Sequence, residues 1–385
     1  MTNLLYNQSA YIKTFTAQVL TCETAGEQYV ITLDRTAFFP EQGGQSCDRG
    51  TLGGAHVNNV QIRGGVVYHA TDAPLAVGTV VDGAIDWARR YDNMQNHTGE
   101  HIVSGILHTM FGYDNVGFHL GDTVMTLDTS GELTAEQRNE VELRANRAVW
   151  DNVPVEVTYP DAAALETLEY RAKLELTEDV RIVTIPGWDV CACCAPHVAR
   201  TGEVGMIRII DAIRWKCGMR LTLVCGTRAL LDYRMRHTAL SQISTALSAK
   251  PEETYDAFCR VQNIVSEQKQ EIVRLKRELL AYQLSSVQET AGNLCLFLPD
   301  ADNETLRAAV NSCVGKYGGL CGAFSGCDAD GYRFVIGSEH IPLRARAKEI
   351  TSALDGRGGG SDQMISGAVK ASVAEIRAYF TAYTI

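Results

Sequence analysis

Two short stretches, about 95 residues apart, carry residue types that could do chemistry. The first holds His97 and His101, whose spacing of four places both imidazoles on one face of a helix. The second holds Cys193 and His197, again four positions apart. Two histidines, a cysteine and a third histidine form a ligand set suited to Zn²⁺. We therefore predict a zinc site at these four residues.

The spacing leaves two questions about this site open. Four protein ligands close a zinc site and favour a structural metal, whereas a catalytic zinc keeps one position free for water or substrate. Cys193 gives the Cys-x₃-His spacing, but Cys191 and Cys194 are close competitors as the thiol ligand. Glu100, between the two helical histidines, could serve as a base or could equally face solvent.

The bulk composition limits what kind of protein carries this site. A chain of 385 residues, 45% hydrophobic and 21% charged, is long enough for two or three globular domains. Its net charge of −11 argues against indiscriminate binding of nucleic acid, although a local basic patch could still bind a specific RNA. The sequence shows no signal peptide and no apolar run of about 18 residues. We expect a cytoplasmic protein without a membrane partner, whose twelve cysteines are reduced thiols or metal ligands.

The first 90 residues consist of short β-prone runs between turn residues, a pattern that predicts a small barrel. Gly43 and Gly44 lie between two of these runs and permit a positive φ or a close backbone approach. The simpler interpretation is a turn between strands. The functional interpretation is a loop that presents Gln45 to a substrate.

From Trp87 onward the apolar residues follow helical spacing, and Gly112 is a plausible end of this helix. Further helices are predicted over about 134–149 and 161–176, with strands between and after them. The segment 91–238 therefore reads as an α+β domain.

Residues 208–236 are the one clearly basic segment of this acidic chain. Only Asp211 and Asp232 oppose its seven basic residues, which are Arg208, Arg214, Lys216, Arg220, Arg228, Arg234 and Arg236. A solvated face is the simpler interpretation. Since the segment follows the second motif closely, a phosphate-binding role has equal weight.

The last third of the chain predicts a long helix and a separate unit. Residues 251–285 carry a heptad-like apolar seam with charges on the other faces, which suits a helical arm, a coiled coil between subunits or a spacer. Beyond them, buried-type strands alternate with helices, and residues 356–360 are rich in glycine. These glycines could cradle a phosphate or allow close packing, and no Walker lysine accompanies them.

The two metal motifs resemble the signature of alanyl-tRNA synthetase editing domains and of the free-standing AlaX trans-editing proteins. The stretch Phe39–Gln45, with Asp48 and Gly50, looks like the substrate loop of that family. Residues 201–205 and 216–220 look like the stretches that follow its second motif, and 356–367 is similar to the end of its accessory domain, DHHA1. The architecture resembles the long AlaX subgroup.

One departure from the family pattern lies beside the metal. The usual Cys-Gly-Gly-Thr-His is Cys193-Cys194-Ala195-Pro196-His197 in this sequence. This change removes backbone flexibility and a hydroxyl group. It affects the expected rate or specificity of the reaction, but it leaves both predicted metal ligands in place.

Pattern and resemblance together imply an α+β protein of four parts. These are a small N-terminal β-barrel (1–90), a zinc-binding α+β editing domain (91–238), a helical coiled-coil arm (239–288) and an α/β DHHA1-like glycine-rich C-terminal domain (289–385). The family activity would be deacylation of tRNA(Ala) mischarged with serine or glycine, with Zn²⁺ as cofactor. No adenylate-forming region precedes the barrel, so we expect action in trans. A homodimer would form through the arm or the C-terminal domain.

The resemblance also implies roles for individual residues. Thr98 would meet the hydroxyl of a seryl substrate, and Gln45 would help to hold the aminoacyl end. The catalytic candidates are Thr98, Gln45 and Cys193, and the substrate-binding candidates are Gly43, Gly44, Gln45, Thr98, Lys216 and Arg220.

Two other functions compete with this interpretation. A non-catalytic, zinc-containing tRNA-binding or assembly protein would bind tRNA without deacylating it. A DHH-type phosphoesterase, which shares the accessory domain, is disfavoured because no two histidines are adjacent in the sequence.

Overall fold

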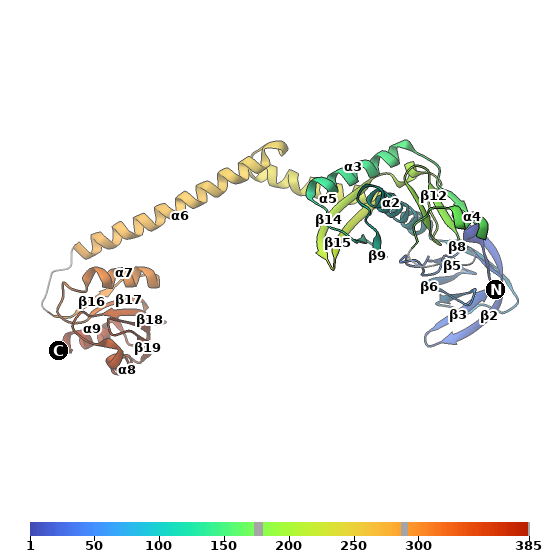
Figure 1. Cartoon of the computed structure of the whole chain (residues 1–385). Coiled ribbons are helices and arrows are strands. Elements are labelled where there is room, and N and C mark those ends of the chain that lie inside the picture. Colours follow the sequence, from blue (N-terminus) through green and yellow to red (C-terminus); the bar gives the residue numbers. More distant parts are fainter. Residues whose placement is uncertain (173–179, 286–291, 384–385) are drawn as a thin grey trace. The chain divides into compact units, whose positions relative to one another are not determined.

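The computed structural model describes residues 1–172, 180–285 and 292–383 (Figure 1). It divides into two compact units, Met1–Gln242 and Ile243–Ile385. Both units combine helices with sheets, so the mixed α+β class predicted from the sequence is confirmed. Among the described helices, none combines the length and the apolar character needed to cross a bilayer.

The N-terminal part of the first unit is a closed six-stranded barrel in the order β2-β3-β7-β6-β5-β8. Its interior is filled by alternating apolar residues such as Val19, Ile31 and Val67, all of which are fully buried. The strands are β2 Thr14–Ala25, β3 Gln28–Leu33, β5 Gly50–Leu52, β6 Ala55–Arg63, β7 Val66–Thr71 and β8 Val80–Ile85. The short elements β1 Asn3–Leu4, α1 Leu5–Gln8 and β4 Arg35–Thr36 complete this part.

Helix α2, Trp87–Phe111, follows the barrel and forms the centre of the first unit. It begins at Asp86, whose side chain accepts a hydrogen bond from the backbone N–H of Arg89, and ends at Gly112 with a φ of 66°. The helix packs between a four-stranded antiparallel sheet, β14-β15-β10-β9, and helix α3. These elements are β9 Asn115–Leu120, β10 Met125–Thr129, α3 Ala135–Asp151, β14 Ile207–Trp215 and β15 Gly218–Cys225.

A small antiparallel sheet, β11-β12-β13, brings the second metal motif to helix α2. Its strands are β11 Glu156–Thr158, β12 Ile182–Ile185 and β13 Asp189–Ala192, and a 3₁₀ helix, η1 Thr201–Val204, follows. A Cβ atom at Gly105 of α2 would lie 2.2 Å from the carbonyl oxygen of Trp188. The absence of a side chain at Gly105 therefore allows β13 to start in contact with the helix.

The helix predicted over 161–176 is wrong beyond its first turns. Helix α4 spans Ala162–Thr167 only, and Leu168 is already extended. Arg171 instead forms backbone hydrogen bonds with β13, donating to Val190 (2.9 Å) and accepting from Ala192 (2.9 Å). Because the N–H and C=O of Arg171 are bonded to β13, they are not available for the hydrogen bonds of a helix. The remainder of the prediction, 173–179, lies outside the described residues.

A buried ion pair joins the barrel to helix α2. The side chains of Arg90 and Asp48 are both fully buried and form hydrogen bonds with each other. The Arg90 guanidinium also donates to the carbonyl oxygens of Ala10 (3.0 Å) and Ala37 (2.6 Å), and Asp48 accepts from the N–H of Phe39 (2.6 Å). Every charged group of this pair is therefore hydrogen-bonded, as a buried pair requires.

The second unit contains a five-stranded sheet, β16-β17-β18-β20-β19, in which only β16 and β17 run parallel. Its strands are β16 Leu294–Phe297, β17 Cys321–Cys327, β18 Gly331–Gly337, β19 Gly356–Gly360 and β20 Met364–Val369. The helices of this part are α7 Asn303–Cys313, α8 Leu343–Ala353 and α9 Val373–Ala382. The glycine-rich stretch is the edge strand β19, where a Cβ at Gly358 would lie 2.5 Å from the carbonyl oxygen of Ser366. This contact supports the close-packing alternative at that position.

Two long helices lie between strand β15 and strand β16 in the sequence. They are α5 Gly226–Ala246 and α6 Thr254–Ser285, with a 3₁₀ turn, η2 Pro251–Glu253, between them. Apolar residues of the α6 heptad seam are exposed in this single chain: Phe258 is 45% exposed, Ile272 54% and Leu279 58%.

Candidate metal centre and its cavity

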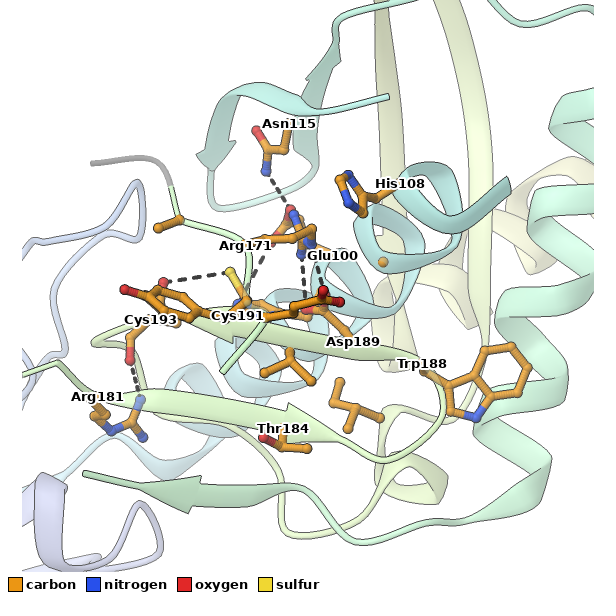
Figure 2. A pocket seen from close by; sticks show the side chains of 18 of the residues that line it. Glu100, His108, Asn115, Arg171, Arg181, Thr184, Trp188, Asp189, Cys191 and Cys193 are labelled. Atoms are coloured by element: carbon orange, nitrogen blue, oxygen red, sulfur yellow. Dashed lines mark hydrogen bonds and ion pairs between the residues drawn. The ribbon is translucent and has the colours of Figure 1, made fainter. Parts of the chain in front are cut away.

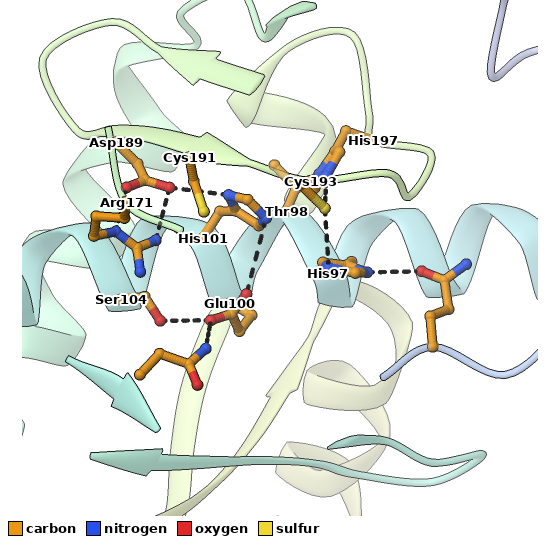
Figure 3. Close-up of polar contacts among 12 residues, drawn as sticks. His97, Thr98, Glu100, His101, Ser104, Arg171, Asp189, Cys191, Cys193 and His197 are labelled. Atoms are coloured by element: carbon orange, nitrogen blue, oxygen red, sulfur yellow. Dashed lines mark hydrogen bonds and ion pairs between the residues drawn. The ribbon is translucent and has the colours of Figure 1, made fainter. Parts of the chain in front are cut away.

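The structure brings the four predicted ligands together. His97 and His101 extend from consecutive turns of α2, while Cys193 and His197 lie in the segment after β13 (Figure 3). Their ligand atoms all lie within 4.8 Å of one another. The Sγ atom of Cys193 is 3.6 Å from Nε2 of His97 and 3.4 Å from Nε2 of His197. Three ring nitrogens and one sulfur converging in a buried site are a donor set that fits Zn²⁺.

Each of the three histidines uses its Nδ1 atom for a contact with another side chain. His97 Nδ1 donates to Oε1 of Gln45 (2.8 Å), and His101 Nδ1 donates to Oδ2 of Asp189 (2.9 Å). His197 Nδ1 lies 3.0 Å from the hydroxyl oxygen of Thr98. These partners fix the ring orientations and leave the three Nε2 atoms to face the metal position, as is usual around metal-binding histidines.

The surroundings of the three neighbouring thiols distinguish Cys193 from its competitors. Burial alone would raise the pKa of the Cys193 thiol, but the positive charges of His97, His101 and His197 lower it well below its usual value. Burial raises the pKa of Cys191 and of Cys194 to about 11. Because the thiolate is the metal-binding form, the structure favours Cys193 as the sulfur ligand.

Asp189 and Arg171 belong to this site, and the sequence interpretation missed both. The guanidinium of Arg171 donates two hydrogen bonds to the Asp189 carboxylate, at 2.8 and 2.9 Å. Burial favours a raised pKa for Asp189, but the hydrogen bonds from His101 and Arg171 outweigh it and lower the pKa. Asp189 could have been found from strand alternation, because it lies two positions before Cys191 on the same face of β13.

The cluster opens onto a cavity of about 1210 Å³. Figure 2 shows the side chains around it, which come from α2, β9, the segment around Arg171, and β12 and β13. The lining combines charged groups with an aromatic ring and a thiol: Glu100, Asn115, Arg171, Arg181, Trp188 and Cys191. Its volume exceeds the range of about 300–1,000 Å³ that small-molecule sites usually have, so it can hold more than one free amino acid.

The predicted substrate loop reaches this cavity through Gly43, which lines it. Gly43 and Gly44 have φ values of 64° and 79°. A Cβ at Gly44 would lie 2.7 Å from the carbonyl oxygen of Phe118, so only glycine lets the loop pass this close to β9. The next residue, Gln45, then reaches His97 and not the cavity lining.

The other predicted substrate-binding residues lie outside the cavity lining. Thr98 is fully buried and accepts a hydrogen bond from the N–H of Val198 (3.3 Å) in addition to its contact with His197. Lys216 lies in the turn between β14 and β15, with a φ of 53°. The guanidinium of Arg220 forms an ion pair with Asp128 (2.6 Å).

The basic segment 208–236 is largely neutralised in the folded chain. Five of its seven basic residues form ion pairs, which are Arg208–Glu142, Arg214–Glu132, Arg220–Asp128, Arg228–Asp92 and Arg236–Asp232. Within the part of the chain that the structure describes, no ion pair is recorded for Lys216 or Arg234. A solvated, paired surface therefore accounts for most of this segment.

The chain is similar to two tRNA synthetase family models and to several named proteins. Residues 180–220 match the model of the threonyl and alanyl tRNA synthetase second additional domain, and residues 3–89 match that of class II (A) tRNA synthetases. The alanyl-tRNA editing protein Aarsd1 of Mus musculus is 28% identical over 94% of this chain and 93% of its own length. The alanyl-tRNA editing protein AlaX-L of Pyrococcus horikoshii is 26% identical over 98% and 96%.

The chain is thus similar, over nearly its whole length, to proteins named alanyl-tRNA editing proteins. The alanine–tRNA ligase of Pyrococcus furiosus is also similar, with 31% identity over 96% of this chain, but the chain spans only 42% of that ligase. The solved C-Ala domain of alanyl-tRNA synthetase from Aquifex aeolicus covers 25% of this chain at 19% identity and a TM-score of 0.22, which is too low to support an inference. The two sequence motifs thus bring His97, His101, Cys193 and His197 together in one site.

Proposed function

We propose that this protein hydrolyses the ester bond of tRNA(Ala) that carries serine or glycine, and that it acts in trans. The observation that carries the proposal is the cluster of three buried imidazoles and one half-buried cysteine at the wall of a cavity of about 1210 Å³. The relatives that this chain covers almost end to end are named alanyl-tRNA editing proteins. A hydrolytic site of this size suits the aminoacyl end of a tRNA.

The chemistry of amino-acid selection explains the need for such a site. A pocket that accepts alanine cannot strongly reject glycine, and serine adds only one hydroxyl. Binding alone discriminates between such substrates by roughly 10²-fold, so a second, hydrolytic site must remove the errors.

Under this proposal, Zn²⁺ is held by His97, His101, Cys193 and His197, and when bound it would supply Lewis-acid polarisation or an activated water. Gln45 and Thr98 then act as positioning residues, because each contacts the Nδ1 atom of a ligand histidine. Gly43 lines the path of the aminoacyl end.

We propose that Lys216, which has no recorded ion pair among the described residues, contributes a phosphate contact outside the cavity. Arg220 and Gly44 then act indirectly, because Arg220 is paired with Asp128 and Gly44 shapes the loop.

The test is deacylation of Ser-tRNA(Ala), Gly-tRNA(Ala) and Ala-tRNA(Ala) by the wild type and by Cys193→Ala, His97→Ala and Cys194→Ala. We expect the wild type to hydrolyse the seryl and glycyl esters and to spare the alanyl ester. Loss of a ligand should lower the rate by more than about 10²-fold, since changes in the outer shell alone cost 10–100-fold. Cys194→Ala is the matched control because its thiol keeps a high pKa.

A non-catalytic role is the competing outcome, since four protein ligands suit a closed structural zinc. A wild-type protein that contains zinc and binds tRNA, yet leaves all three esters intact, would show that the site is structural and that the proposed activity is wrong.

A further inference from the structure

The carboxylate of Glu100 is buried in the wall of the same cavity. Glu100 lies between His97 and His101 on α2, and its side chain is only 4% exposed. It lines the cavity together with both histidines. A buried carboxylate next to a cluster of metal-binding residues needs a physical reason, because removing its charge from water is costly.

The two oxygens of this carboxylate have different surroundings (Figure 3). Oε1 accepts hydrogen bonds from the hydroxyl of Ser104 and from Nδ2 of Asn115, both at 2.5 Å. Oε2 lies 4.0 Å from Nε2 of His101, the nitrogen that faces the metal position. Within the described part of the chain, every hydrogen bond recorded for this side chain is on Oε1. The two donors therefore hold the group in place and leave one oxygen directed at the reaction site.

The sequence around Glu100 supports a catalytic role for this oxygen. His97-Thr98-Gly99-Glu100-His101 has the form His-x-x-Glu-His, in which the glutamate directly precedes the second helical histidine. The inverzincin metalloproteases carry the same arrangement, and the related His-Glu-x-x-His helix uses its glutamate as the general base of hydrolysis. The comparison concerns geometry on a helix, not common ancestry.

We propose that Oε2 of Glu100 is the general base for hydrolysis of the aminoacyl ester. This inference rests on the proposed function. The carboxylate takes a proton from a water molecule while the water oxygen bonds to the ester carbonyl carbon. The bond from that carbon to the ribose oxygen then breaks, and the proton passes from Glu100 to the leaving ribose oxygen. One water is consumed, and the products are the free amino acid and a tRNA with a free terminal hydroxyl.

Glu100→Gln separates this role from a purely structural one. Glutamine has the same shape and keeps an oxygen that can accept from Ser104 and Asn115, so the packing of α2 against β9 is preserved. It cannot accept the proton. We expect kcat for Ser-tRNA(Ala) to fall by about 10²–10⁴-fold, with KM, zinc content and unfolding midpoint unchanged. Glu140→Gln, which removes a carboxylate from the exposed surface of α3, is the control and should keep the wild-type kcat.

A second substrate distinguishes a base from a receptor for the substrate ammonium group. Nitrous acid converts seryl-tRNA into the matching glyceryl ester, which has no α-ammonium. If Glu100 is the base, the kcat defect of Glu100→Gln is equally large with this ester. If Glu100 binds the ammonium group, the defect disappears with the glyceryl ester, and the proposal is overturned.

The two proposals fail in different ways. A wild-type protein that hydrolyses seryl-tRNA while Glu100→Gln keeps its kcat would overturn the role of Glu100 alone. A wild-type protein that hydrolyses none of the esters would overturn the proposed function and, with it, the role of Glu100.

Discussion

Ring orientation is the property on which the candidate metal centre depends most directly. The three histidines direct Nε2 toward one point because Gln45, Asp189 and Thr98 contact their Nδ1 atoms. Asp189 is the only charged member of these three and is itself held by Arg171. Changing Asp189 should therefore affect the metal without removing a ligand.

We predict that Asp189→Asn weakens zinc binding by about 10–100-fold. The asparagine oxygen can still accept a hydrogen bond from Nδ1 of His101. The negative charge that makes His101 a more basic ligand, and that neutralises Arg171, is lost. Competition with a chromophoric chelator measures the change. Asp114→Asn is the matched control. Oδ1 of Asp114 lies 3.2 Å from Nδ1 of His108, another histidine of α2, but both of these side chains are exposed. Equal zinc affinity in Asp189→Asn and the wild type would contradict this account.

The four clustered residues could be predicted from spacing, but Asp189 and Arg171 behind them could not. The i, i+4 pairs encode a local geometry that any helix or tight turn reproduces. Arg171 meets Asp189 only because residues near 171 form a bridge with β13 rather than a helix. The spacing of Glu100 allows either a base or a solvent-facing residue, and its burial follows from packing against Ser104 and Asn115, which no local pattern reveals.

At the scale of elements, one barrel strand contains a buried histidine that makes the barrel sensitive to pH. His69 on β7 is fully buried, its Nδ1 donates to the carbonyl oxygen of Ile31 (3.1 Å), and its Nε2 accepts from the hydroxyl of Thr36 (2.9 Å). The contact with Thr36 requires a neutral ring, because Nε2 can accept only when it carries no proton, whereas Nδ1–H can donate to Ile31 in either protonation state. Burial lowers the pKa of His69 to about 4.

We predict that this histidine destabilises the folded chain as the pH falls. An unfolded histidine has a pKa of about 6.5, so between pH 6.5 and pH 4 the unfolded chain binds a proton that the folded chain does not. The free energy of unfolding should fall over this window by on the order of 3 kcal/mol from His69. Urea denaturation at several pH values measures it. His69→Gln should flatten the pH dependence, and an unchanged slope in that variant would contradict the prediction.

Elements with strong local periodicity were predicted better than elements fixed by their neighbours. Helix α2 begins at Trp87, as its apolar spacing indicated, and ends where Gly112 adopts a positive φ. The helix predicted over 161–176 failed because its backbone is needed by β13, a partner that no local pattern reveals. The glycines of β19 illustrate the same limit, since their neighbours on β20 are set by sheet pairing.

At the scale of the whole molecule, helix α6 exposes more apolar surface than a single chain needs. Its seam residues Val265 and Ile272 are 43% and 54% exposed, as are others along the heptad. Contiguous apolar surface of this kind marks an association site, and a heptad seam suits pairing with a second helix. The sequence predicted the seam, and its exposure in the single chain fits a second helix that covers it.

We predict that the protein forms a homodimer through α6. Val265→Glu combined with Ile272→Glu places charges in the seam and should convert the dimer into a monomer in sedimentation experiments. The deacylation rate per chain should be unchanged, because the cavity is lined by residues of the first unit. Gln270→Glu, a charge added to the same helix outside the seam, is the control. A wild-type chain that sediments as a monomer would contradict the prediction.

The buried pair of Arg90 and Asp48 also limits how this protein could have evolved. Removing one member of such a pair leaves an uncompensated charge and costs about 3–5 kcal/mol, a large part of the stability of a typical domain. A gene rearrangement that joined the barrel to a foreign helix, or the helix to a foreign barrel, would create that cost in one step. We therefore expect the barrel and the histidine-bearing helix to be inherited together.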